Sequence, residues 1–232
     1  MKPVAIFRHS PAEGPGYFAT FLENHSIPWQ LFSIDAGDSP PASPEEFAGL
    51  CFMGGPMSVN DDLPWLPLAF ALIQKAVDLN IPVIGHCLGG QLMSRALGGI
   101  ITKNPVKELG WGEVIVTDLR AVDWLGEMDR FEAFHWHGET FSIPPGATRL
   151  LASRECANQA FVLGPHLGLQ CHVEMTEPMI RLWNQAWADE KASPSPSVQT
   201  PDQMMEHVEP RIAAMRQAAN RLYTHWIAHL AS

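Results

Sequence analysis

The feature that most constrains this chain is an apolar run leading directly into Gly-x-Cys-x-Gly. Residues 81–84 precede the sequence Gly-His-Cys-Leu-Gly, which has Cys87 at its centre, and the helix-like segment 91–97 follows. This order is typical of a nucleophile elbow, in which a strand ends, the chain turns sharply and a reactive side chain is held at the turn. The flanking glycines leave room for a strained backbone. We expect the positive end of the helix dipole to favour the thiolate form of Cys87.

A second signal lies further along the chain, where a short apolar segment is followed by His172-Val173-Glu174. A cysteine nucleophile requires a base, and the base requires an acid that orients it. We expect His172 and Glu174 to fill these two roles at the end of another strand. Without them, a lone cysteine after an apolar run is more often a small buried hydrophobic residue.

Four segments give the chain a resemblance to class I glutamine amidotransferases, of the stand-alone type related to the glutaminase domain of GMP synthase. They are Met-Gly-Gly-Pro-Met-Ser at 53–58, Gly-His-Cys-Leu-Gly-Gly-Gln at 85–91, Asn-Gln-Ala-Phe at 158–161 and Gly-Leu-Gln-Cys-His-Val-Glu at 168–174. Two positions depart from the family pattern: His86 stands where an aliphatic residue is usual, and Val173 where proline is usual. Neither removes a catalytic side chain, but His86 alters the electrostatic surroundings of the thiol.

The resemblance also implies roles for residues around the triad. It implies that the backbone amides of Gly55 and Leu88 form an oxyanion hole, since such donors are aimed before the reaction begins. The simpler interpretation of Gly54-Gly55-Pro56 is a tight turn after a strand. The residues that the resemblance places at or near the substrate pocket are Gly54, Gln91, Trp136, His137, Gln159 and Phe161.

Two histidines raise the question of a metal. Alternation along a strand would put His135 and His137 on one face, a spacing that can bind a metal ion. No carboxylate or cysteine nearby completes a site, so we predict no metal. The chain also has no glycine-rich phosphate loop, and we predict no cofactor.

Composition limits the remaining classes of function. The 232 residues suit one domain, 1–232, and a hydrophobic content of 46% is ample for its core. Asp and Glu number 25 against 15 Lys and Arg, which argues against a nucleic-acid partner because phosphate binding needs a basic face. No window approaches a membrane span, and the N-terminus does not resemble a signal peptide. The four cysteines lack metal spacing, so we expect free thiols in the cytoplasm.

The pattern of elements predicts an α/β fold: a flavodoxin-like, doubly wound, mostly parallel sheet with helices on both faces. Expected strands are 4–8, 29–34, 50–53, 82–85 and 167–171, and expected helices are 15–25, 64–79, 91–97, 176–190 and 203–230. Short β segments such as 113–117 and 132–135 suggest an antiparallel insert or edge between residues 100 and 163, and we expect a loop over 192–201. A stripe on the last helix predicts core packing: Ile212, Met215, Ala219, Leu222 and Trp226.

The predicted reaction is transfer or hydrolysis at a γ-glutamyl amide through a Cys-His-Glu triad and a thioester intermediate. Three interpretations stay open. The chain is a glutaminase acting on glutamine with a separate synthase subunit, or a free-standing γ-glutamyl hydrolase or peptidase. The third interpretation is a non-catalytic redox-sensing or binding protein on the same fold, which would have no need of all three of Cys87, His172 and Glu174.

Overall fold

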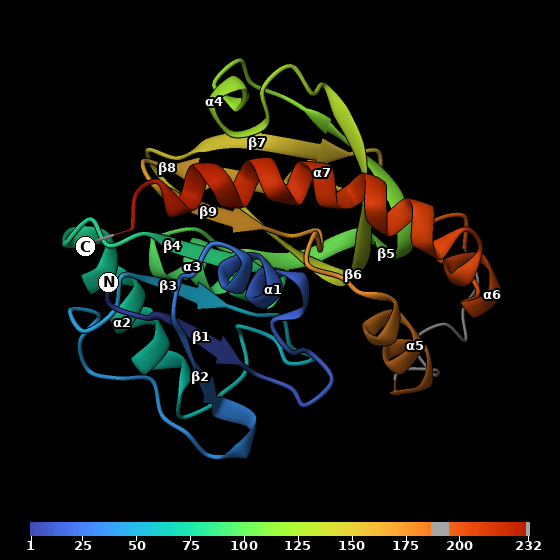
Figure 1. Ribbon diagram of the computed structural model, residues 1–232. Coiled ribbons are helices and arrows are strands. Elements are labelled where there is room, and N and C mark those ends of the chain that lie inside the picture. Colours follow the sequence, from blue (N-terminus) through green and yellow to red (C-terminus); the bar gives the residue numbers. More distant parts are fainter. Residues whose placement is uncertain (187–194, 231–232) are drawn as a thin grey trace.

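A nine-stranded sheet runs through the molecule in the computed structural model, which describes residues 1–186 and 195–230 (Figure 1). Five strands form a parallel half, in the order β2 (Trp29–Ser33), β1 (Val4–Arg8), β3 (Gly49–Phe52), β4 (Val83–His86) and β9 (His166–Leu169). Antiparallel pairing extends the sheet through β8 (Ala160–Leu163), β7 (Thr148–Ser153), β5 (Ile101–Val116) and β6 (Arg130–Phe141). The expected antiparallel edge is therefore present.

Helices cover both faces of the parallel half, because each strand alternates its side chains between two cores. On one face, α2 (Leu66–Asp78) and α3 (Leu88–Ala96) enclose a core that contains Phe7 and Phe52. This arrangement confirms one side of the predicted doubly wound fold.

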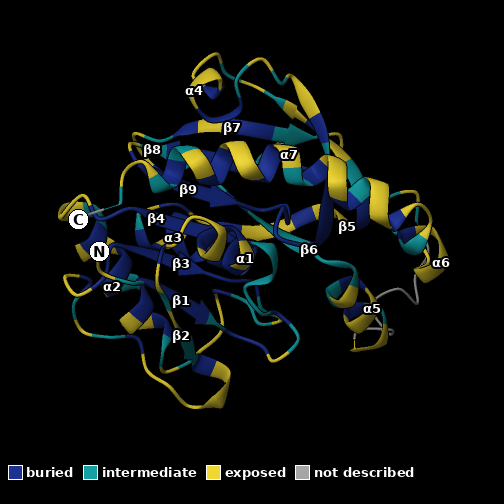
Figure 2. Cartoon of the chain, viewed as in Figure 1, coloured by how far each residue is buried: buried dark blue, intermediate teal, exposed yellow. Residues whose placement is uncertain are grey.

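The opposite face is covered by α1 (Gly16–Asn24) and the long helix α7 (Val208–Ile227), which lies along the sheet in Figure 1. Their core contains Ile6 and Cys51, the alternate residues of β1 and β3. The predicted stripe on the last helix is buried in this core: Ile212, Met215, Ala219, Leu222 and Trp226. Figure 2 shows α7 buried on the side that faces the sheet and exposed on the other.

The C-terminal helices begin and end differently from the prediction of one helix over 203–230. The helix α6 (Pro201–Met205) starts earlier, because Thr200 and Gln203 form a capping box. Glu206 is extended and His207 adopts a left-handed conformation (φ 53°), so the chain breaks before α7. The predicted helix 176–190 is α5 (Glu177–Ala186) over the described residues; its last four residues, and 192–194 of the predicted loop, lie outside them.

The strands β5 and β6 are much longer than the short segments expected there. Their sequence hides this because Pro105 and Gly110 interrupt the strand pattern, and Gly110 has φ 109°. The pairing of β5 with β6 continues past Pro105, because its register shifts between Lys103 and Glu108. Two short elements complete the described structure, a 3₁₀ helix at Ile34–Ala36 and α4 (Ala121–Leu125). Within residues 1–186 and 195–230, no helix is both long and apolar enough to cross a membrane.

Candidate active site

The predicted nucleophile occupies a strained turn at the centre of the sheet. Cys87 follows β4 directly and precedes α3, and its φ of 51° with ψ of −107° is unusual for a residue with a side chain. Glycine is needed beside it because the backbones come very close: a Cβ at Gly89 would overlap the carbonyl oxygen of Phe52, and one at Gly85 would overlap the backbone of Gly89. The local geometry is that of a nucleophile elbow.

His172 and Glu174 form a short, buried pair just beyond β9. Nδ1 of His172 lies 2.6 Å from Oε1 of Glu174, and both side chains are 1% exposed. Burial raises the pKa of Glu174, but the charges of His172 and His86 and the hydrogen bonds outweigh it and lower the pKa to about 2. Glu174 is therefore ionised at neutral pH and fixes the His172 ring. Among the described residues, Nε2 of His172 has no hydrogen-bond partner.

The thiol of Cys87 shares one cavity of about 230 Å³ with His172. Burial raises the pKa of Cys87 well above its usual value, and the negative charges of Glu13 and Glu174 raise it further. The amide of Leu88 opposes these effects but is outweighed. Burial of the thiol therefore opposes the preference for the thiolate that the helix dipole is expected to give.

Several residues predicted at the pocket lie there. Those that line the cavity with Cys87 are Gly55, Gln91, Trp136 and His137. Gly54 adjoins it, because an added Cβ would lie 3.3 Å from Cε1 of His172. Gly55 and Leu88 are also neighbours: a Cβ at Gly55 would lie 2.8 Å from Cδ2 of Leu88.

Gln159 and Phe161 lie elsewhere. Nε2 of Gln159 donates to Oε2 of Glu108 at 2.8 Å, and Phe161 packs edge-on against Phe141 with ring centroids 5.2 Å apart. Neither lines the cavity of Cys87. Their predicted role as substrate contacts has no support in this geometry.

The site also contains four polar residues that the sequence analysis did not predict there. Glu13, Lys107 and Glu139 line the cavity, and Nε2 of Gln170 donates to Sγ of Cys87 at 3.5 Å. Gln170 lies within a matching segment and could have been found from its place two residues before His172. The other three lie on segments with no pattern of their own, and only the fold brings them to the cavity of Cys87.

Comparison with known proteins assigns the family. A family model for class I glutamine amidotransferases matches residues 22–178. The chain is 31% identical over 176 residues to the glutamine amidotransferase-like protein YfeJ of Salmonella typhimurium, covering 72% of this chain and 74% of that protein. The chain belongs to the class I glutamine amidotransferases.

Other relatives agree with this assignment. One subunit of the glutamine-hydrolysing GMP synthase of Sulfolobus acidocaldarius is 34% identical over 134 residues, which cover 56% of this chain and 69% of that relative. A crystal structure of a glutamine amidotransferase from Methylobacillus flagellatus superposes with a TM-score of 0.96 at 45% identity, covering 100% of this chain and 96% of that one. The family implies an enzyme that hydrolyses the side-chain amide of glutamine.

His86, which the sequence suggested as a departure from the family pattern, is not among the residues that line the cavity. Its Nε2 lies 2.9 Å from the hydroxyl of Tyr223 and 4.0 Å from Oε2 of Glu174, and its Nδ1 lies 3.8 Å from Sγ of Cys51. Burial lowers the pKa of His86, although the charge of Glu174 opposes this. The His86 side chain therefore lies beside Glu174 and Tyr223.

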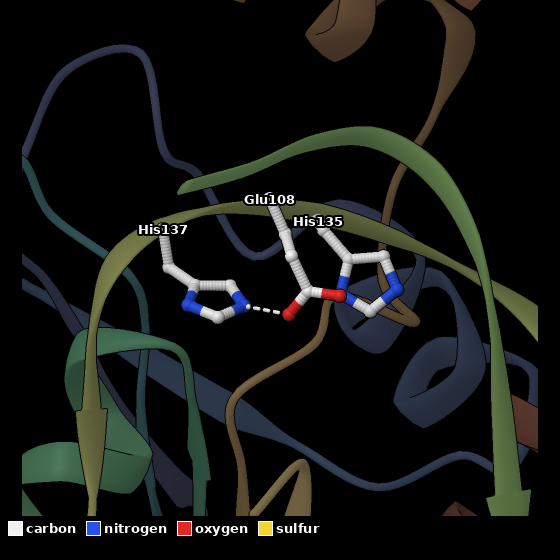
Figure 3. Close-up of side chains that lie close together, drawn as sticks. All are labelled: Glu108, His135 and His137. Atoms are coloured by element: carbon white, nitrogen blue, oxygen red, sulfur yellow. Dashed lines mark ion pairs between the residues drawn. The ribbon is translucent and has the colours of Figure 1, made fainter. Parts of the chain in front are cut away.

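The expectation that no carboxylate accompanies His135 and His137 is wrong. One possible metal ligand atom from each of Glu108, His135 and His137 lies within 4.8 Å of the others (Figure 3). Burial lowers the pKa of His135 to about 4. Burial also raises the pKa of Glu108, but its contacts with the two histidines and with Ser153 reverse this effect and lower it. The β5–β6 pairing brings Glu108 opposite His137 in the sheet.

Proposed function

We propose that this amidotransferase hydrolyses the side-chain amide of glutamine with Cys87 as nucleophile, His172 as base and Glu174 as the orienting acid. The observation that carries the proposal is the unpartnered Nε2 of His172. Its ring is held by Glu174 through Nδ1, and it lines the same cavity as the strained Cys87. A fixed base beside an elbow thiol is the arrangement that covalent catalysis requires.

In the first step, His172 Nε2 takes the thiol proton of Cys87 as the sulfur attacks the amide carbon. A C–S bond forms, and the carbonyl π pair moves onto oxygen. The intermediate then collapses, the C–N bond breaks, and the proton on His172 goes to the leaving nitrogen. Ammonia departs and a γ-glutamyl thioester remains on Cys87.

In the second step, a water molecule attacks the thioester. His172 removes a proton from the water, a C–O bond forms and the C–S bond breaks. The proton returns to the sulfur of Cys87, and glutamate leaves. Glu174 stays ionised throughout and stabilises the imidazolium, consistent with its low pKa.

The oxyanion of each intermediate needs donors that are already in place. We assign this role to the backbone amides of Gly55, which lines the cavity, and of Leu88, which follows Cys87 directly. The Leu88 amide opens α3, so it also carries the positive end of the helix dipole.

Recognition of the amino-acid end of glutamine requires opposite charges. We assign Glu13, which is 5% exposed, to the ammonium group and Lys107 to the carboxylate; both line the cavity. Binding of an ammonium group would offset the negative charge that raises the pKa of Cys87. Substrate binding thereby favours the thiolate.

Glutamine is preferred over larger γ-glutamyl conjugates because the cavity is small. Its volume of about 230 Å³ lies below the range of roughly 300–1,000 Å³ typical of pockets for drug-sized ligands. Hydrolysis of γ-glutamyl peptides is the second candidate, and a non-catalytic redox or binding role is the third. We also propose a single domain over 1–232, a separate synthase subunit that receives the ammonia, and a cytoplasmic location, which suits four unpaired cysteines.

An assay of the purified protein distinguishes these candidates. Ammonia release from glutamine is compared with cleavage of a panel of γ-glutamyl peptides, with Cys87→Ala as the blank. We expect the higher kcat/KM on glutamine. A clear preference for the peptides would instead support the hydrolase, and no cysteine-dependent turnover of either would support a non-catalytic role.

A further inference from the structure

Three buried side chains converge beside the catalytic cavity and have no part in the proposed reaction as a group. Glu108 comes from β5, and His135 and His137 come from β6. Figure 3 shows both imidazole rings turned toward the Glu108 carboxylate. Nε2 of His137 lies 3.0 Å from Oε2 of Glu108.

Backbone contacts define which nitrogen of each ring carries a proton. Nδ1 of His137 lies 3.0 Å from the carbonyl oxygen of Glu139, and Nε2 of His135 lies 3.3 Å from that of Gly112. A carbonyl can only accept, so these nitrogens are the donors. In the neutral rings, Nε2 of His137 and Nδ1 of His135 therefore carry lone pairs, and both lie near the carboxylate.

In this arrangement the lone pairs of the two imidazole nitrogens face the carboxylate oxygens of Glu108, and all of these atoms are hydrogen-bond acceptors. Neither His135 Nδ1 nor His137 Nε2 has a hydrogen-bond partner among the described residues, although both are buried. A proton on one ring would satisfy only one of them. A single cation among the three groups would satisfy both lone pairs and the carboxylate together.

The surroundings match those of metal ligands. Ligating histidines usually donate their second nitrogen to a carbonyl, and ligating carboxylates are themselves hydrogen-bonded. Here Ser153 Oγ donates to Oε1 of Glu108 at 2.7 Å and Gln159 Nε2 donates to Oε2 at 2.8 Å. Gln159 thus has a role in this cluster.

Size and access also fit. Two ligands about 2.1 Å from one zinc ion lie at most roughly 4.2 Å apart, so atoms within 4.8 Å need only a small adjustment. Glu108 and His135 line a second cavity of about 460 Å³, which offers a route of entry and room for a water ligand.

We propose that Glu108, His135 and His137 bind one divalent transition-metal ion, with zinc as the class that two imidazoles and one carboxylate suit. His137 also lines the catalytic cavity, so the ion would stiffen one wall of that cavity. The inference goes beyond the proposed amide hydrolysis and does not depend on it.

The test uses the full-length, tag-free chain carrying Cys87→Ala, which removes the cavity thiol as a competing ligand. Zn²⁺ affinity is measured by competition with a chromophoric chelator, and bound metal is counted by mass spectrometry. His135→Gln keeps a donor for Gly112 but removes Nδ1, and Glu108→Gln removes the charge. His229→Gln is the matched control, because the half-buried His225 and the exposed His229 lie one turn apart on and just beyond α7 and could bind Zn²⁺ adventitiously.

We expect one Zn²⁺ per chain, retained in His229→Gln and weakened more than about 100-fold in both cluster variants, since loss of an outer partner alone costs 10–100-fold. Equal affinity in His135→Gln, or loss in His229→Gln instead, would overturn the proposal. Anomalous diffraction at the zinc edge tests the site without any cluster variant. A peak among the three side chains supports the proposal. A fully occupied zinc site at another position, with no peak among the three side chains, refutes it.

Discussion

Glu174 and His172 lie 2.6 Å apart, oxygen to nitrogen, and both side chains are 1% exposed. The ionised carboxylate accepts from Nδ1 of His172, which leaves the lone pair on Nε2 for the cavity. Oε2 of Glu174 also accepts from the amide of Val173 at 3.0 Å, so the carboxylate cannot turn freely. The tautomer and orientation of His172, the proposed base, are therefore set before substrate arrives.

This relationship predicts unequal effects of two substitutions. His172→Ala should lower kcat by about 10³-fold or more, because it removes the proton acceptor. Glu174→Gln should cost less, since in triads the orienting acid is worth less than the base. Steady-state ammonia release measures both. Near-normal turnover in His172→Ala would assign the base elsewhere, with His137 of the same cavity the first alternative.

The assignment of Cys87 as the nucleophile is tested by covalent labelling. A diazo-ketone analogue of glutamine should modify Cys87 alone, because Cys51 and Cys171 are fully buried away from the cavity. Peptide mapping identifies the labelled thiol. Cys87→Ala should abolish both labelling and turnover, whereas Cys156→Ala should keep both. A label on any other cysteine contradicts the assignment.

Glu13 should control both binding and thiol reactivity. Glu13→Gln should raise KM for glutamine roughly 10- to 100-fold. A hydrogen bond to a charged group contributes about 1.5–3 kcal/mol, which corresponds to this range. The same change removes a charge that raises the pKa of Cys87, so iodoacetamide should alkylate the free enzyme faster at a given pH. Glu139→Gln is the control for alkylation, and equal rates in both variants would contradict the role of Glu13.

His166 should make the protein acid-labile. Burial and the charge of His229 lower its pKa to about 4, and its Nδ1 accepts from the amide of Val83 at 3.2 Å. Because the unfolded side chain has a pKa near 6.5, the unfolded state binds the proton first as pH falls. Stability is therefore lost between pH 6.5 and 4, by at most about 3 kcal/mol from this residue.

Urea unfolding of the wild type and His166→Asn at pH 7 and pH 4.5 measures this loss. The asparagine oxygen can accept from Val83 but does not titrate, so the stability of the variant should fall less across the window. Other buried histidines, including His9, titrate in both proteins, so their effect on stability cancels when the two are compared. An equal fall in the two proteins would show that His166 is not responsible.

The sequence by itself determined the parts of this protein whose cause is local. The elbow at Cys87 follows from an apolar strand, flanking glycines and a helix, which must be adjacent in the chain for the turn to form. His172 and Glu174 lie two residues apart, so their pairing needs only the end of one strand. The parallel strands and most helices could be predicted for the same reason, because hydrophobic periodicity within a single segment indicates them.

The tertiary structure decided what depends on distant segments meeting. Glu13 and Lys107 line the cavity of Cys87 from a loop and a strand whose own sequences carry no signal, and Glu108 meets His137 only through the β5–β6 ladder. Pro105 and Gly110 conceal that ladder locally, while many cross-strand contacts stabilise it once the sheet forms. The pKa of Cys87 also depends on the whole fold, because burial raises it and the amide of Leu88 at the start of α3 opposes this only in part.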